Sequence, residues 1–242
     1  MSWFFSRTKV DFADIHTDIH SHMIPGIDDG SDNMQETITL IKGMSDLGYK
    51  KMILTPHVRY GSFDNDTRQF DSRLEEVKIA LKEAGVDMQL EVGAEQTIDE
   101  GFMEHFERGE LKSFGKKKYL LIEFSFYSLP MNIKDIIFQL QREGYRLILA
   151  HPERYLYLRT DTAMLEYLRD SGMLFQLNIL SLVGFYNKAV EQFAKYLIKN
   201  DYIDLVGTDL HHQKHLDGII KAQTNKTLYK LIESGRLMNN MF

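Results

Sequence analysis

Nine side chains that can bind divalent metal ions end or follow the short apolar strands expected along this chain. They are His20, His22, Asp29, His57, Glu95, Glu123, His151, Asp209 and His211. One strand supplies only one or two ligands, so several strands that converge at one end can build a site for more than one ion. Nine ligands suit two or three ions. Such clusters activate water for hydrolysis of phosphate esters, and amide hydrolysis is the competing chemistry.

Two histidines open this series. His20 and His22 are two residues apart on an expected strand, so both imidazoles point to one face and can hold one ion together. A lone His-x-His pair is weak support for a metal site, but a turn-rich stretch with two carboxylates follows. Either Asp28 or Asp29 can serve as a ligand there, and the other can cap the next helix.

The later candidates carry different amounts of information. Glu123 stands between two large apolar residues, where a charge is costly to bury without compensation. His151 directly follows four apolar residues, and Pro152 predicts an extended backbone at His151. Asp209 and His211 repeat the two-apart spacing of the first pair.

Each candidate also has a purely structural explanation. His57 fits a loop histidine, Glu95 a surface carboxylate and Glu123 a helix-capping acid. Mixed imidazole and carboxylate ligands without thiolate suit manganese, iron, zinc or cobalt better than calcium. Arg59 and Arg154 each follow a candidate histidine closely, and their planar guanidinium groups favour phosphate as the substrate group, although a surface ion pair also explains Arg59.

A repeated order of amphipathic helix, glycine and short apolar strand positions these residues. We expect strands at 18–22, 52–54, 88–92, 119–122, 147–150, 174–178 and 205–206, and helices at 32–47, 67–84, 133–143, 162–170 and 188–199. Alternating helices and buried apolar strands predict a parallel sheet. A closed α/β barrel brings all strand ends together, whereas an open doubly wound sheet, the alternative, spreads them along a line.

The composition predicts one globular domain. The chain has 242 residues, 43% hydrophobic residues and a net charge of −6, and no linker-like stretch divides residues 1–242. We expect residues 1–13 to form an N-terminal extension, in which Trp3, Phe4 and Phe5 pack on the domain or form a small patch that docks a partner or touches a membrane.

Several function classes are excluded or disfavoured. The absence of cysteine excludes disulfides, thiolate metal sites and a phosphocysteine intermediate. The chain contains no apolar run of about 18 residues, the length that would indicate a membrane span. A cytoplasmic protein is therefore expected. The acidic balance gives no support for nucleic acid as a partner.

At this point the chain resembles the polymerase and histidinol phosphatase (PHP) superfamily, and more closely its bacterial tyrosine-protein phosphatases of the CpsB/CapC/YwqE type. The resemblance rests on Asp18-Ile-His-Ser-His22 with Asp28-Asp29-Gly30, Thr55-Pro-His57, Gly93-Ala-Glu95, Ile122-Glu-Phe124, Ala150-His-Pro-Glu-Arg-Tyr155 and Thr208-Asp-Leu-His211. It implies a distorted (β/α)7 barrel with up to three metal ions, often manganese.

The resemblance also implies roles for single residues. His20, His22, Glu95 and Asp209 would hold one ion; Glu95, Glu123 and His151 a second; Asp29, His57 and His211 a third. Arg154 and Arg59 match positions expected to bind phosphate. Many relatives carry an arginine and prolines after the Asp-x-His motif, whereas this chain reads His212-Gln-Lys-His215, so Lys214 or His215 would replace that contact.

The implied reaction is hydrolysis of phosphotyrosine on a protein, typically the tail of a membrane tyrosine kinase that controls capsule or exopolysaccharide export. Metal-activated hydroxide would attack without a covalent phosphoenzyme. The alternatives are a small-molecule phosphatase, such as a histidinol-phosphate phosphatase, and a binding module that uses metal only for structure. A nuclease is disfavoured by the missing basic surface.

Overall fold

A computed structural model describes residues 9–242 of the chain. The expectation for Trp3, Phe4 and Phe5 lies outside the described residues. Two residues of the expected N-terminal extension, Val10 and Phe12, are buried in the core, and the Val10 amide donates a hydrogen bond to the Gln223 carbonyl at 2.8 Å.

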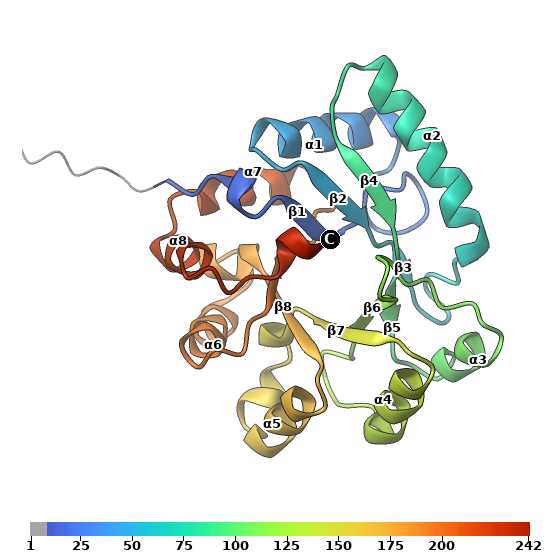
Figure 1. The fold of residues 1–242 in the computed structure, drawn as a ribbon, viewed down its shortest axis with the longest axis vertical. Coiled ribbons are helices and arrows are strands. Elements are labelled where there is room, and N and C mark those ends of the chain that lie inside the picture. Colours follow the sequence, from blue (N-terminus) through green and yellow to red (C-terminus); the bar gives the residue numbers. More distant parts are fainter. Residues whose placement is uncertain (1–8) are drawn as a thin grey trace, which may run out of the picture.

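All strand pairings are parallel, and Figure 1 shows the strands around a common centre with the helices outside them. The strands are β1 (Thr17–Ser21), β2 (Lys51–Leu54), β3 (His57–Val58), β4 (Gln89–Val92), β5 (Glu95–Thr97), β6 (Tyr119–Glu123), β7 (Arg146–Ala150), β8 (Leu174–Asn178) and β9 (Leu205–Gly207). The helices are α1 (Met34–Asp46), α2 (Phe70–Glu83), α3 (Phe102–Glu107), α4 (Ile133–Arg142), α5 (Thr162–Asp170), α6 (Lys188–Lys199), α7 (Gln213–Ala222) and α8 (Lys226–Glu233).

These nine strand segments correspond to seven barrel strands, because two strands are interrupted. β2 and β3 are separated only by Thr55 and Pro56, and β4 and β5 only by Gly93 and Ala94. β2 pairs with β4, and β3 pairs with β5, so the same two strands run side by side before and after the interruptions. Pro56 cannot donate a ladder hydrogen bond, which explains the break between β2 and β3. The expected order of seven strands is therefore confirmed.

The first and last strands meet at the carboxyl end of the barrel. A parallel bridge joins Ser21 to Leu210. The Asp209 amide donates to the His20 carbonyl at 2.8 Å, and the His22 amide donates to the Leu210 carbonyl at 2.9 Å. The expected α/β barrel fold is confirmed, and these hydrogen bonds hold two ligand-bearing strand ends against each other.

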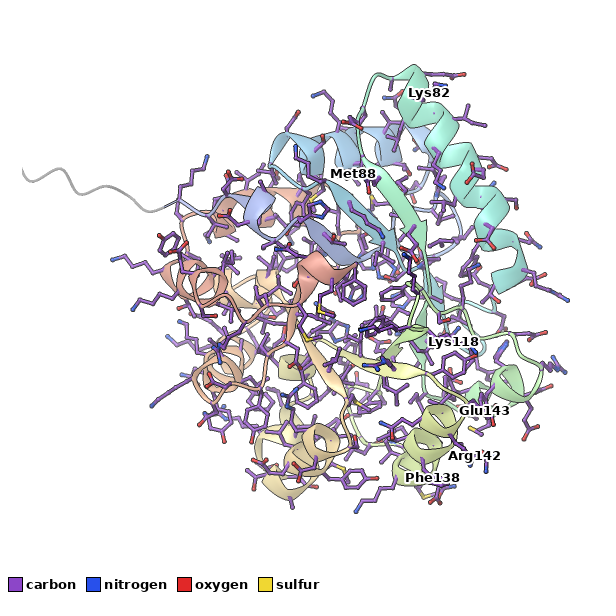
Figure 2. All side chains as sticks on the ribbon, in the orientation of Figure 1. Lys82, Met88, Lys118, Phe138, Arg142 and Glu143 are labelled. Carbon is purple, nitrogen blue, oxygen red and sulfur yellow. The ribbon has the colours of Figure 1, made fainter. Side chains whose placement is uncertain are left out.

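Two apolar layers stabilise this arrangement. A small cluster that includes Ile53, Leu121, Ile148 and Leu205 comes from the strands, and the larger cluster packs the helices against their outside. Figure 2 shows side chains filling the space within the ring of strands. The C-terminal Phe242 packs against this inner cluster, and Figure 1 shows the C-terminus at the middle of the ring. The barrel is thus a packed core rather than a pore.

The helix boundaries differ from the expected ones only near their ends. The expected helix 67–84 begins with the 3₁₀ turn Thr67–Gln69 before α2, and helix α1 begins at Met34 because the Asn33 side chain caps it by accepting from the Glu36 amide. Helices α7 and α8, which follow the last strand, were not expected from the sequence. Within residues 9–242, no helix is long and apolar enough to cross a membrane.

Candidate metal centre

A cavity of about 300 Å³ opens at the carboxyl ends of the strands. Its walls are Asp29, His57, Arg59, Glu95, Glu123, Phe126, His151, Arg154, Tyr186, Asp209, His211, His212 and His215. His20 and His22 are fully buried and contact the wall residues Glu95 and Asp209. The structure therefore brings all nine sequence-derived candidates together.

The deepest group contains His20, His22, Glu95 and Asp209, whose ligand atoms all lie within 4.8 Å of one another. His20 Nε2 is 3.2 Å from Glu95 Oε2 and 3.4 Å from Asp209 Oδ1. His22 Nε2 is 3.5 Å and 3.4 Å from the same two oxygens. Two imidazole nitrogens and two carboxylate oxygens thus face one point.

Two partners outside this group set the tautomers of its histidines. His20 Nδ1 lies 2.9 Å from Gln176 Oε1, and His22 Nδ1 lies 2.8 Å from Asp28 Oδ2. Both partners are acceptors, so each Nδ1 carries the proton and each Nε2 presents a lone pair. The two Nε2 atoms are only 3.2 Å apart. A cation between them satisfies both lone pairs.

A second group contains Asp29, His57 and His211 together with His22. Asp29 Oδ1 is 3.5 Å from His57 Nε2 and 3.3 Å from His211 Nε2. His211 Nδ1 lies 2.8 Å from the Asp209 backbone carbonyl, so its Nε2 lone pair faces Asp29. Of the two aspartates left open by the sequence, Asp29 lines the cavity, while Asp28 orients His22 and accepts from the His57 amide at 3.0 Å.

A third group joins Glu95 and Glu123 through histidines on either side. His57, Glu95 and Glu123 place ligand atoms within 4.8 Å of one another. His151 Nε2 lies 3.0 Å from Glu95 Oε1 and 3.6 Å from Glu123 Oε1. Glu95 contacts four histidines in total, so it stands at the centre of the arrangement.

The charges and unpaired atoms of the site fit bound metal. Burial alone would raise the pKa of Glu95, but His20 and His57 hold it well below its ordinary value. Burial alone would lower the pKa of His20, yet Glu95 and Asp209 raise it to about 9. Among the described residues, the buried atoms Glu95 Oε2, His57 Nδ1 and His151 Nδ1 have no hydrogen-bond partner. Without metal, the carboxylates of this pocket favour protonated histidines. Divalent ions would replace those protons.

The backbone at two of the candidates is strained, and one expectation about it was wrong. His151 has φ 35° and ψ 57°, a left-handed conformation, rather than the extended form expected before Pro152. Asp209 also has a positive φ, of 51°. This region is sparsely populated for residues other than glycine. In both cases it turns the side chain into the cavity directly after a strand.

Arg154 is held between two aromatic rings. Its guanidinium carbon lies 4.4 Å from the centre of the Phe126 ring and 4.6 Å from that of Tyr186. One nitrogen, Nη1, donates to Asp209 Oδ2 at 3.1 Å. The rings keep the guanidinium plane in the cavity wall, where it can bind an anion.

The other two cationic candidates lie in different settings. Arg59 Nη2 forms an ion pair with Glu123, and Arg59 Nε donates to Thr97 Oγ1 at 3.2 Å. Lys214 Nζ lies 5.5 Å from the centre of the Phe185 ring, and Lys214 does not line the cavity. His215 does line it. The His212 amide donates to His215 Nδ1 at 3.2 Å, which leaves the proton of a neutral ring on Nε2.

Several supporting residues were missed by the sequence analysis. Gln176 and Asn178 lie on β8, a strand to which no chemical role was assigned. Asn178 Nδ2 donates to Asp209 Oδ2 at 3.0 Å and to the Tyr186 hydroxyl at 2.7 Å. Two polar residues with alternate spacing in the otherwise apolar run Leu174–Asn178 were the available signal, because a buried amide needs a partner.

Comparison with known proteins gives a consistent result. The family model described as capsular polysaccharide synthesis, CpsB/CapC, matches residues 16–236. Tyrosine-protein phosphatase YwqE of Bacillus subtilis (strain 168) is 28% identical over 197 residues, which cover 81% of this chain and 78% of that protein. Tyrosine-protein phosphatase CpsB of Streptococcus pneumoniae is 27% identical over 200 residues, with coverage of 81% and 82%.

Solved structures agree with the sequence relatives. A crystal structure from work on YwqE of B. subtilis and CpsB of S. pneumoniae, described as unique metal-dependent tyrosine phosphatases, superposes with a TM-score of 0.79 at 26% identity and covers 92% of this chain and 94% of that chain. Histidinol phosphate phosphatase from Lactococcus lactis, solved with zinc, L-histidinol and phosphate, has a TM-score of 0.58 at 13% identity, with coverage of 92% and 94%. The second likeness concerns the fold alone.

Proposed function

The chain belongs to the CpsB/CapC family, and from this membership and the geometry of the cavity we propose that it is a metal-dependent phosphatase acting on phosphotyrosine in proteins. The observation that carries the proposal is the convergence of nine imidazole and carboxylate ligands on one cavity that also holds a guanidinium group between two aromatic rings. Metal ligands, an anion-binding group and apolar ring faces are what hydrolysis of an aryl phosphate needs.

We propose three sets of ligands. His20, His22, Glu95 and Asp209 hold one ion; Glu95, Glu123 and His151 hold a second; and Asp29, His57 and His211 hold a third. Manganese is the proposed metal, and iron, zinc and cobalt suit the same donors. Bound divalent ions supply the Lewis acidity that activates water and neutralises phosphoryl oxygens.

The chain's own side chains bind and orient the phosphate. Arg154 directs its guanidinium group toward the phosphoryl oxygens, and the Phe126 and Tyr186 rings limit its rotation. Arg59 contributes a second positive charge beside Glu123. Lys214 and His215 are the candidates for a third contact, and the position of His215 in the cavity wall, with its Nε2 proton free to donate, supports His215.

The leaving group explains why no strong general acid is required. Tyrosine has a reference pKa of about 10, so tyrosinate departs more easily than an alkoxide. The chain has no cysteine, so a phosphocysteine intermediate cannot form. We extend the proposal to the substrate: the phosphorylated tail of a membrane tyrosine kinase of capsule or exopolysaccharide export, reached from the cytoplasm.

A substrate panel tests the proposal. The purified protein, stripped with a chelator and then supplied with manganese, is offered a phosphotyrosyl peptide, a phosphoseryl peptide and histidinol phosphate, and released phosphate is measured. We expect the phosphotyrosyl peptide to have the highest kcat/KM, and activity to depend on the added metal. Faster turnover of histidinol phosphate would replace the proposal with a small-molecule phosphatase, and no turnover of any substrate would favour a structural metal module.

A further inference from the structure

A second cavity, of about 510 Å³, lies beside the metal cavity. We call it the side groove. Its apolar lining comes from the segment after β5, from α3, from the loop between β6 and α4, and from α4 itself. The apolar residues are Ile98, Met103, Leu129, Pro130, Met131 and Ile136. Its size is within the range of ligand sites, and the sequence analysis assigned it no role.

The side groove adjoins the metal cavity through contacts between their linings, although no residue lines both. Thr97 lines the groove, and its Oγ1 donates to Glu123 Oε2 at 3.2 Å and accepts from Arg59 Nε. The loop after β6 serves both cavities, because Phe126 lines the metal cavity while its neighbours Ser125 and Ser128 line the groove. A molecule bound at the metals therefore has the groove directly beside it.

The loop between β6 and α4 presents large apolar side chains to solvent. Met131 is 99% exposed and Tyr127 is 93% exposed. Apolar groups gathered at the rim of a site commonly mark a surface that binds another molecule. Asp99 and Glu100 also line the groove, so its apolar surface carries negative charge on one side.

The size of the metal cavity indicates what occupies the groove. About 300 Å³ accommodates a phosphotyrosyl side chain but not the peptide that carries it. In an extended peptide, neighbouring residues lie about 3.3 Å apart along the chain, so the residues next to the phosphotyrosine must lie on the rim. We propose, on the basis of the proposed function, that the side groove binds these flanking residues and prefers an apolar residue together with a basic one.

Kinetics on matched substrates test this preference. The substrates are a short phosphotyrosyl peptide with leucine and arginine beside the phosphotyrosine, the same peptide with glycine and glutamate there, and p-nitrophenyl phosphate. Met131→Glu should lower the ratio of kcat/KM for the first peptide to that for p-nitrophenyl phosphate by about fivefold or more. Glu100→Lys should shift the preference from the arginine peptide toward the glutamate peptide.

The chain offers a matched control. Phe138 is 65% exposed and lies on α4 outside the groove, and Figure 2 labels it near Arg142 at the carboxyl end of that helix. Phe138→Glu adds the same charge and should leave the ratio unchanged. The inference is overturned if Met131→Glu leaves the kcat/KM ratio unchanged and Glu100→Lys leaves the preference between the two peptides unchanged. It is also overturned if Phe138→Glu lowers the kcat/KM ratio as much as Met131→Glu does.

Failure of the proposed function remains distinguishable. If the metal-loaded protein hydrolyses neither peptide nor p-nitrophenyl phosphate, the proposed function fails. Peptide binding at the side groove is then measured by fluorescence anisotropy, with a labelled form of the phosphotyrosyl peptide that carries leucine and arginine. Weaker binding by Met131→Glu than by Phe138→Glu supports the groove, and equal binding overturns it.

Discussion

The Nε2 atoms of His20 and His22 lie 3.2 Å apart, and in the neutral rings neither nitrogen carries a proton to donate to the other. Gln176 and Asp28 hold the protons on the opposite ring nitrogens. Two lone pairs that face each other beside two carboxylates require a positive charge between them, either a proton or a metal cation. Among the contacts of the cavity, this pair of atoms is where the geometry most favours a bound metal ion.

Asp28 should control metal affinity without being a ligand. Asp28→Asn weakens the acceptor for His22 Nδ1 and for the His57 amide, and we expect metal affinity to fall by about 10- to 100-fold. Isothermal titration calorimetry of the metal-free protein with manganese measures this affinity. Asp32→Asn, which neutralises an exposed carboxylate in the same loop, is the control. Equal affinities of the two variants would contradict the role of Asp28.

Gly207 should be essential because it leaves room for His20. A Cβ at this position would lie 2.6 Å from Gln176 Nε2 and 2.9 Å from the His20 Cβ. We expect Gly207→Ala to lower the free energy of unfolding by about 1–3 kcal/mol and to weaken metal binding as well. Gly101→Ala is the control, because the three atoms nearest to its Cβ all belong to the exposed Tyr60 side chain, which can move into solvent. Chemical denaturation and metal titration of both variants measure the two effects.

The planar shape of Arg154 should matter beyond its charge. Arg154→Lys keeps the positive charge but loses the stacking between Phe126 and Tyr186. We expect kcat/KM for a phosphotyrosyl peptide to fall by about tenfold or more. Arg159→Lys, at an exposed position on the same loop, should change it little. Wild-type kinetics in Arg154→Lys would show that stacking does not orient the phosphate.

A pH-dependent contribution to stability is expected at the opposite end of the barrel. Burial alone would raise the pKa of Glu91, but hydrogen bonds from Lys51 Nζ and the Gly115 amide, each at 2.6 Å, lower it from the ordinary value of 4.5. A lowered pKa stabilises the fold above that value, and the stabilisation is lost as pH falls through the lowered pKa.

Glu91→Gln should therefore lower the free energy of unfolding by about 0.5–1 kcal/mol at neutral pH, since the pair is partly exposed. The difference should shrink as the pH falls below 4.5. Urea denaturation of the metal-free protein across this range measures it. A constant difference at every pH would mean that the Glu91 charge is not involved.

Much of the site could be predicted because parallel strands force it together. Candidate ligands on strands far apart in the sequence, such as His57 and His151, both contact Glu95 because all strands point the same way. The backbone at His151 could not be predicted from local sequence, since tertiary contacts override the preference that proline imposes on its neighbour. Gln176 was missed because its role depends on His20, which lies on another strand.

The elements after the last strand were also not anticipated. They follow the motif residues, and the sequence analysis assigned no periodicity to them. Their position accounts for the place of His215: His212 is the N-cap residue of α7, its amide donates to His215 Nδ1, and His215 lines the cavity. The sequence left Lys214 and His215 as alternatives, and only the fold shows that His215 lines the cavity and Lys214 does not.

The number of metal ions bound per chain is the decisive measurement for the proposed metal centre. Inductively coupled plasma mass spectrometry of the purified protein should find two to three transition metal ions per chain, and His22→Ala should lose at least one of them. Phosphotyrosine hydrolysis should disappear on chelation and return with manganese. Less than one bound ion per chain, or full activity after complete metal removal, would contradict the account.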